Sequence, residues 1–297
     1  THCQFSAFKG SDWSNMRSGA EEIAKYVNHH DHVTIDLGQV VFTDTTTMTA
    51  DGPFQYTLHQ LSGNKWVNHD VETETSSGIV PFRYKRKSYV HATQWAIGLE
   101  LALMIRSPWK VFLTTDHPNA APFTTYPKII SWLMSKHARQ RVLKRINAKA
   151  GRRCALASID REYDFYDIAI ATRAGTAKAL GLEWKGHLGV GADADIAVYD
   201  INPEKIDPSK EYTAVRKAFE RAAYTIKGGE VVAKSGEIVK PLMGRTHWVD
   251  VKTRSPKEVD ADLKRRFEEY WTVQYENYAI PEKYLHSPVS IPIMAEV

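Results

Sequence analysis

The residues best suited to chemistry form a short polar run, Thr115-Asp116-His117-Pro118-Asn119, which directly follows the apolar segment 110–114. A continuous apolar segment of this length is typical of a strand that is covered on both faces. Polar side chains just past the carboxyl end of a parallel strand lie where barrel enzymes hold their catalytic groups. Asp116 is therefore the leading candidate for a catalytic carboxylate. His117 and Asn119 could donate hydrogen bonds to a substrate, and an ordinary turn role suits them equally well.

Histidines are the next candidates, because a neutral imidazole is a common zinc ligand. His2 follows the first residue of the segment 1–5, which resembles the end of a strand. Taken alone, it is an ordinary histidine near a terminus. His29, His30 and His32 form a tempting cluster, but they fall between a predicted helix and the strand that follows it. That position is the stability face of a barrel, so we expect solvated turn residues.

Composition excludes several classes of protein. The 297 residues include 43% hydrophobic and 25% charged side chains, which is ordinary globular usage. No apolar run is long enough to span a bilayer, and a net charge of +4 does not imply nucleic-acid binding. The two cysteines, Cys3 and Cys154, cannot form a disulfide scaffold or hold an iron–sulfur cluster, and they fit a reducing, cytoplasmic location.

The pattern along the chain predicts alternating strands and helices, with one long interruption. A strand end at 1–5, a helix beginning near Ser18 and a strand over 33–37 form a unit that implies parallel strands. Residues 39–88 are rich in Thr, Gly and Asp and contain no long helix, so they are predicted to be an inserted subdomain. Glu21 lies three residues after Ser18, as in a capping box.

The remainder of the chain is predicted to be mainly helical and then mainly β. Helices are expected over 89–105, 126–147, 165–180 and 256–271, and short antiparallel strands over 222–239. Glycine pairs and Ser-Gly steps between those strands are typical of hairpin turns. The predicted domains are a later part of a barrel over 1–182, a small β-sandwich over 183–244 and an extension over 245–297.

Three segments resemble the amidohydrolase superfamily. They are the strand-end run 115–118, the helix end 174–182 followed by Gly186-x-Leu-x-x-Gly-x-Asp-Ala-Asp195, and the hairpin 225–237. The resemblance implies a (β/α)8 barrel, of which only the later strands lie in this chain, and a small C-terminal β-sandwich. By this mapping His2 ends strand six, 33–37 is strand seven and 110–114 is strand eight.

The resemblance also implies a dinuclear zinc centre. Its ligands would come from an early His-x-His, a carboxylated lysine, histidines on the middle strands and the last-strand aspartate. Only His2 and Asp116 match that pattern here. His30-Asp31-His32 has the right spacing but precedes a strand. The other ligands, including the lysine, are expected outside this chain, which would then be the C-terminal half of a longer protein.

A narrower resemblance, over 1–8, 44–53 and 114–123, is to the A-subunit family of formylmethanofuran dehydrogenases. It implies formation or hydrolysis of N-formylmethanofuran from formate and methanofuran, during carbon dioxide reduction in methanogenic archaea. Implied partners are iron–sulfur subunits and a molybdenum or tungsten formate dehydrogenase subunit. Asp116 would shuttle the proton. The alternatives are a hydantoinase or dihydropyrimidinase type of cyclic amidohydrolase, and a metal-free scaffold subunit.

One charged segment remains open to three interpretations. The run 136–153 contains eight Lys and Arg residues. A solvated helix face is the favoured interpretation. The resemblance adds a second, since methanofuran carries glutamyl carboxylates that basic side chains could steer. Contact with a partner subunit is the third.

Overall fold

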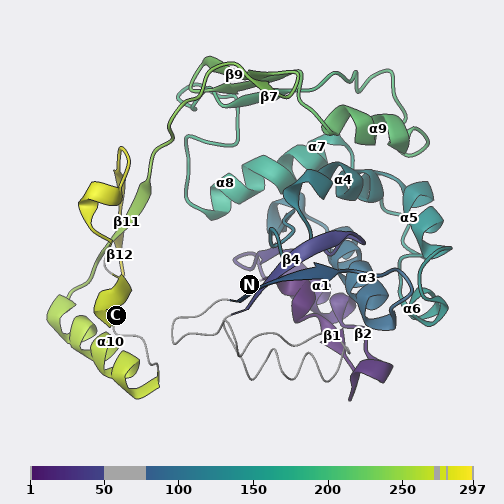
Figure 1. Ribbon diagram of the computed structural model, residues 1–297, viewed down its shortest axis with the longest axis horizontal. Helices are drawn as coiled ribbons and strands as arrows, with labels where there is room; N and C mark the ends of the chain where they lie inside the picture. The colour runs from purple at the N-terminus through teal and green to yellow at the C-terminus, as the bar shows by residue number, and fades with distance from the viewer. Residues whose placement is uncertain (1, 50–77, 271–274, 279, 296–297) are drawn as a thin grey trace. The chain divides into compact units, whose positions relative to one another are not determined.

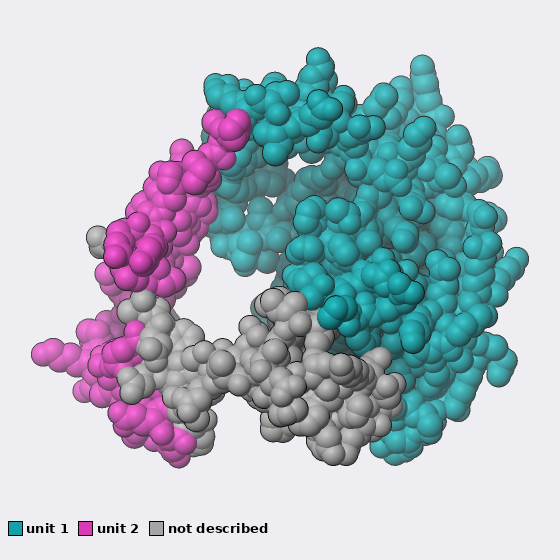
Figure 2. All heavy atoms as spheres, viewed as in Figure 1, with its two compact units in different colours: residues 1–48, 53–66, 79–240 teal, residues 49–52, 67–78, 241–297 magenta. Residues whose placement is uncertain are grey.

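The computed structural model describes residues 2–49, 78–270, 275–278 and 280–295 (Figure 1). The chain divides into two compact units, which Figure 2 shows in different colours. Unit 1 comprises residues 1–48, 53–66 and 79–240, and unit 2 comprises residues 49–52, 67–78 and 241–297. The domain boundaries expected at 182 and 244 stay predictions.

Unit 1 contains a short parallel sheet that carries candidate residues. Strand β3 (Ile35–Asp36) pairs in parallel with β6 (Val111–Phe112), and His2 forms a parallel bridge with Asp36. The ladder continues past the strand ends, where the amide of Gln39 donates to the Thr114 carbonyl over 2.8 Å. The predicted parallel neighbours are confirmed. The strand expected over 1–5 is wrong beyond His2, because Cys3–Phe5 turns into a 3-10 helix.

Three helices of unit 1 pack together. Helix α3 (Tyr89–Met104) is buried on nearly all sides, as expected of a central helix, and α1 (Ala20–His29) and α6 (Ala148–Arg153) pack against it. The predicted helix over 89–105 is confirmed. The capping box expected at Ser18 is wrong, because Gly19 precedes the first helical residue.

The helix expected over 126–147 is also wrong, because it is interrupted at Ser135. Helix α4 (Tyr126–Met134) ends there and α5 (Lys136–Leu143) begins. Ser135 has an extended backbone, and its hydroxyl accepts from the Ala138 amide over 3.0 Å and donates to the Ser209 carbonyl over 2.6 Å. A capping side chain anchored to a distant loop therefore starts a new helix.

Arg139 departs from the solvated face favoured for the basic run. Its side chain is fully buried and donates to the carbonyls of Trp132 over 2.7 Å and Arg161 over 2.9 Å. Burial lowers the pKa of this guanidinium to about 10. Arg139 thus satisfies one backbone carbonyl near the end of α4 and one in the loop at Arg161, which is a structural role.

A continuous helical stretch confirms the helix predicted over 165–180. It consists of α7 (Phe165–Ala169), a π-helical turn (Ile170–Ala174) and α8 (Gly175–Ala179). Asp164 and Asp167 cap its start reciprocally, and Gly181, at φ +69°, follows its end.

The small antiparallel sheet after this stretch is confirmed, with the order β10-β9-β8-β7. Its strands are β7 (Ile196–Val198), β8 (Tyr224–Lys227), β9 (Glu230–Lys234) and β10 (Glu237–Ile238). Helix α9 (Tyr212–Phe219), which was not predicted, joins β7 to β8 and packs on α4. A second sheet layer, which would make this a sandwich, stays a prediction.

The other elements are shorter or belong to the insertion and the C-terminal extension. In unit 2, β11 (His247–Lys252) and β12 (Val289–Met294) pair in parallel, and α10 (Pro256–Tyr270) matches the predicted helix. β1 (Phe8–Lys9) pairs with β2 (Arg17–Ser18), and β4 (Asp44–Thr49) with β5 (Gly78–Arg83). The rest of the predicted subdomain, 50–77, lies outside the described residues. None of the helices in the described ranges is long and apolar enough to cross a membrane.

Candidate functional site

The imidazole of His2 lies between two carboxylates that come from distant parts of the sequence. Its Nδ1 atom is 2.8 Å from Oδ1 of Asp36, and its Nε2 atom is 3.0 Å from Oδ1 of Asp116. The side chains are partly open to solvent, at 33% for His2 and Asp36 and 25% for Asp116. The structure therefore brings together the two residues that the resemblance pairs, His2 and Asp116.

Asp36 was missed as a site residue. It is the last residue of β3, and it accepts a hydrogen bond from the Thr114 hydroxyl as well as facing His2. The Thr114 hydroxyl in turn accepts from the Gly38 amide over 2.8 Å. The signal that singled out Asp116, a polar side chain at the carboxyl end of a parallel strand, applies equally to Asp36.

Gly38 allows the close approach of the backbone to the imidazole. Its φ is +64°, and an added Cβ would lie 2.5 Å from the Cβ of His2. Both the backbone conformation and the space therefore require glycine at this position.

Asp116 sits at a tight turn four residues after the end of β6. Its φ is +45°, a left-handed conformation that Asp and Asn adopt more readily than other residues with side chains. Asn119 donates from Nδ2 to Oδ2 of Asp116 over 3.1 Å, and its backbone amide donates to the Asp116 carbonyl. Asn119 thus holds one carboxylate oxygen, while the other oxygen faces His2.

His117 does not contact the carboxylate next to it. Its Nδ1 accepts from the Phe123 amide over 3.2 Å, and its ring packs edge-on against the Phe123 ring at 4.9 Å. The His117 ring is thus engaged by its own loop. Its predicted role in substrate binding stays a prediction, as does that of Asn119.

The charges of the two carboxylates influence the pKa of two phenols. Burial, and secondarily the charge of Asp116, raises the pKa of Tyr84, which keeps that hydroxyl protonated. Burial raises the pKa of Tyr126; a hydrogen bond with the Thr115 side chain opposes this rise, and the charge of Asp36 adds to it. Both phenols therefore stay protonated at ordinary pH. Nothing in the local sequence marks them, since each depends on its tertiary surroundings.

His91 is a second buried histidine that the sequence did not signal. Its Nδ1 accepts from the Lys85 amide over 2.9 Å, and its ring lies 5.1 Å from that of Tyr84. Burial, helped by the charge of Lys85, lowers the pKa of His91 to about 4. The imidazole is therefore neutral at ordinary pH, and it fixes the turn that carries Tyr84.

Two histidines of the cluster 29–32 contact their own helix, and Cys3 has a raised pKa. The rings of His29 and His30 each contact a backbone carbonyl one turn earlier in α1, those of Lys25 and Tyr26. Burial raises the pKa of the Cys3 thiol, with a further contribution from Asp36. Cys3 is thus a poor thiolate, as a structural cysteine would be.

The donor set fits part of a zinc site. A neutral imidazole has one N–H, which can serve only one of the two carboxylates that His2 contacts. The other contact requires a further proton or a metal ion between the ring nitrogen and the carboxylate. Two ligands of a tetrahedral zinc ion lie about 3.3 Å apart, close to the 3.0 Å between His2 Nε2 and Asp116 Oδ1. A carboxylate on the other ring nitrogen, here Asp36, is the usual support of a zinc-binding histidine.

Further ligands would be needed to complete such a site. In the part of the chain that the structure describes, no group of three or more His, Cys, Asp or Glu side chains is arranged to hold a metal ion. His2 and Asp116 would therefore be two ligands of a larger set.

Comparisons with known proteins give a consistent picture. The amidohydrolase family profile matches residues 1–233. Protein FwdA of Methanocaldococcus jannaschii is 52% identical over 97% of this chain. The A component of the formyltransferase/hydrolase complex Fhc of Methylorubrum extorquens is 38% identical over 95%. The chain spans 50% of the length of each of these relatives.

A solved structure agrees with these relatives. The crystal structure of the formyltransferase/hydrolase complex FhcABCD from Methylorubrum extorquens, in complex with methylofuran, contains a chain of similar fold. The TM-score is 0.79 at 33% sequence identity, and the match covers 98% of this chain and 52% of that one.

Proposed function

Because this chain belongs to the amidohydrolase family, we propose that it is part of the A-type subunit of a formylmethanofuran dehydrogenase. In this role it forms or hydrolyses the formamide bond of N-formylmethanofuran, with formate and methanofuran as the other reactants. The observation that carries the proposal is the placement of His2 between Asp36 and Asp116 at the carboxyl ends of parallel strands.

The names of the relatives support the substrate class. A formyltransferase/hydrolase complex acts on formyl groups, and the similar solved complex was obtained with methylofuran. That complex has several subunits, FhcABCD, which supports a multi-subunit assembly for this chain too. Iron–sulfur subunits and a formate-producing subunit are part of the proposal.

Asp116 would carry the proton in the reaction. In hydrolysis, water adds to the formyl carbon, the C–N bond breaks, and formate and the amine leave. The Asp116 carboxylate would take the proton from the attacking water and return it to the departing amine nitrogen. Asn119 keeps the carboxylate oriented through its hydrogen bond to Oδ2.

The metal in this proposal is a pair of zinc ions, held in part by His2 and Asp116. When bound, zinc would polarise the formyl carbonyl and favour deprotonation of water. Asp36 would keep the His2 ring in the tautomer that presents Nε2 to the metal. The remaining ligands would come from residues outside those described.

The proposal predicts that Asp116→Asn abolishes turnover without unfolding the protein. Loss of the proton acceptor should cost about 10²–10⁴-fold in kcat. Asparagine tolerates the left-handed backbone at this position, so the melting temperature should change little. Turnover of N-formylmethanofuran and thermal unfolding are measured for the variant and for Asp200→Asn, which removes an exposed carboxylate elsewhere. An Asp116→Asn variant with full activity would remove Asp116 from the mechanism.

Substrate and metal assays separate this proposal from the other two functions. N-formyl amines should be cleaved and cyclic amides should not; the reverse would indicate a hydantoinase or dihydropyrimidinase. The purified native protein should contain about two zinc ions per chain, as in other two-metal sites. Absence of metal together with absence of turnover would indicate a scaffold subunit.

A further inference from the structure

Two glutamines close to the candidate site in sequence are completely buried. Gln4 follows His2 by two residues, and Gln39 follows Gly38 directly; both have an exposed fraction of 0%. Buried amides need hydrogen-bond partners, because an unpaired polar group in a protein interior costs free energy. The partners of Gln4 and Gln39 therefore show what these side chains do.

Gln4 fixes the first segment of the chain along β3 and the residues that follow it. Its backbone amide donates to the Leu37 carbonyl over 3.2 Å, and its Oε1 atom accepts from the Val40 amide over 3.2 Å. These two contacts continue the parallel pairing of His2 with Asp36 after the segment turns into a 3-10 helix. They therefore set the position of His2 lengthwise along the strand.

Gln39 connects the same residues to the end of β6 and to α3. Its backbone amide donates to the Thr114 carbonyl over 2.8 Å, in the segment that leads to Asp116. Its side chain donates from Nε2 to the carbonyls of Val40 over 2.8 Å and Trp95 over 3.1 Å. The N–H of Val40 is thus bound by one glutamine side chain and its carbonyl by the other.

Helix α3 leaves room for both amides. A Cβ on Gly98 would lie 2.3 Å from Oε1 of Gln39 and 3.0 Å from Oε1 of Gln4, so the two side chains occupy the space that glycine leaves free. Glycine in a helix interior is less favourable than alanine. The only glycine of α3 therefore lies where the two glutamines require it.

Packing alone does not account for glutamine at these positions. Within the described ranges of the chain, Nε2 of Gln4 and Oε1 of Gln39 have no hydrogen-bond partner. Unpaired polar atoms in the interior destabilise a fold, and a methionine of similar length would fill the space without them. Buried groups that lower stability are expected where they serve a functional site.

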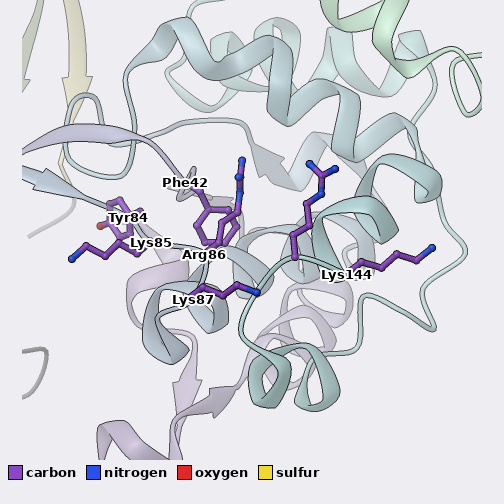
Figure 3. Close-up of a pocket in the computed structure, with 7 residues that line it drawn as sticks. Phe42, Tyr84, Lys85, Arg86, Lys87 and Lys144 are labelled. Atoms are coloured by element: carbon purple, nitrogen blue, oxygen red, sulfur yellow. The ribbon is translucent and has the colours of Figure 1, made fainter.

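The far end of the segment that contains Val40 is held independently. The Phe42 ring lies 5.6 Å from the Trp95 ring, and the Val41 amide donates to the Ala120 carbonyl over 3.3 Å. Figure 3, a close-up of a pocket that Phe42 lines, shows this ring beside Arg86. Loss of a glutamine amide should therefore displace the residues nearest the site and leave the remainder of the segment in place.

We propose that Gln4 and Gln39 are positioning residues that hold the His2 imidazole at its distance from the Asp116 carboxylate. In the part of the chain that the structure describes, their side chains form no hydrogen bond with either of those residues, so they act through the backbone of Val40. This geometry does not depend on the reaction, but its effect on metal binding and turnover rests on the proposed function.

Crystal structures of the native protein and of Gln4→Met test the geometry directly. Methionine fills a similar volume but cannot accept from the Val40 amide, so the segment 1–5 should shift. The distance between His2 Nε2 and Asp116 Oδ1, which is 3.0 Å, should increase beyond hydrogen-bond range. Gln140→Met, which changes a partly exposed glutamine of α5, should leave it unchanged. An unchanged distance in Gln4→Met would overturn the proposal.

Gly98→Ala displaces the same amides by a second route, and it stays informative where Gln4→Met does not fold. The added Cβ pushes both side chains without changing their chemistry, so the distance between His2 and Asp116 should again increase. Gly151→Ala in α6 is the matched control, because its Cβ meets nothing closer than 3.8 Å. Equal distances in the two alanine variants would also overturn the proposal.

Metal affinity and turnover measure the consequence for the site. Gln4→Met and Gln39→Met should each weaken zinc affinity by about tenfold or more in competition with a chelator, and lower kcat by a similar factor with little change in KM. Val215→Ala, a buried substitution in α9, should lower the melting temperature and leave zinc affinity and kcat unchanged. Equal losses of zinc affinity in Val215→Ala and Gln4→Met would reduce the glutamines to a purely structural role and overturn the proposal.

The outcomes separate this inference from the proposed function. If the native protein binds no zinc and cleaves no formamide, but the distance increases in Gln4→Met, the proposed function fails and the positioning role stands. If the native protein cleaves formamides and both methionine variants keep the native distance, zinc affinity and kcat, the positioning role fails alone.

Discussion

The His2 imidazole is held by contacts on both ring nitrogens, and this arrangement determines what each neighbour can do. Because Asp36 accepts from Nδ1, Nε2 is left to face Asp116. The Thr114 hydroxyl adds a hydrogen bond that orients the Asp36 carboxylate. A side chain with no contact to a substrate can therefore decide the tautomer of the group that has one.

Asp36→Asn should weaken zinc binding and activity together. The amide cannot support the imidazole as a carboxylate does, and loss of such a partner typically costs 10–100-fold in metal affinity or activity. Zinc content after dialysis and formamide turnover measure the effect, with Asp200→Asn as the matched exposed control. A variant that retains both zinc and activity would show that Asp36 does not orient His2.

His91 should make the fold sensitive to acid. Its pKa is about 4 in the folded chain and 6.5 ordinarily, so the fold favours the neutral ring. The free energy of unfolding is therefore unaffected by this histidine above pH 6.5. It falls by roughly 2–3 kcal/mol as the pH drops towards 4, because the unfolded chain takes up the proton more readily than the folded chain. Urea unfolding over this range should show a flatter pH dependence for His91→Gln, whose amide oxygen can still accept from Lys85. The exposed His137→Gln should behave like the parent chain, and an unchanged slope in His91→Gln would exclude this assignment.

At the scale of elements, sequence patterns predicted helices correctly where a proline or a glycine lies at the helix end. Pro108 prevents α3 from continuing, and Gly181 follows the helical stretch that ends with α8. The break at Ser135 has no such mark, because it depends on the Ser209 carbonyl 74 residues away. Arg139 likewise looks like a surface residue in sequence, and only the carbonyls around it account for its burial.

Two glycines in helices should respond to alanine in opposite ways. A Cβ on Gly98 in α3 would lie 2.3 Å from Oε1 of buried Gln39 and 3.0 Å from Oε1 of buried Gln4, so Gly98→Ala should destabilise the fold by about 1–3 kcal/mol. A Cβ on Gly151 in α6 meets nothing closer than 3.8 Å, so Gly151→Ala should stabilise it by about 0.5–1 kcal/mol. Chemical denaturation gives both values. Equal effects of the two substitutions would contradict the packing described around Gly98.

For the whole molecule, the sequence predicted the parallel pairing of the strands and two residues of the candidate site. Asp116 was found because it follows a strand, and His2 because of a family resemblance. Tyr84 and His91 were missed, since their burial and their ring contact with each other depend on tertiary packing.

Brief trypsin digestion should cut the chain first after Arg245. This residue ends the exposed segment 241–245, which has no helix or strand and follows the last residue of unit 1. Lys240 precedes a proline, and trypsin cleaves such bonds poorly. Mass spectrometry should detect a fragment ending at Arg245 before any cut inside α3. Early cleavage within unit 1 would show that this segment is better protected than its exposure indicates.

The left-handed backbone at Asp116 also restricts how this chain can diverge. Aspartate, asparagine and glycine are the residue types that tolerate such a conformation most readily, and of these three only aspartate can accept a proton at neutral pH. A paralogue released from selection for catalysis would drift to asparagine or glycine here, since a β-branched residue would damage the turn itself. A single codon change at this position, from aspartate to asparagine or glycine, would thus remove the reaction and leave the fold intact.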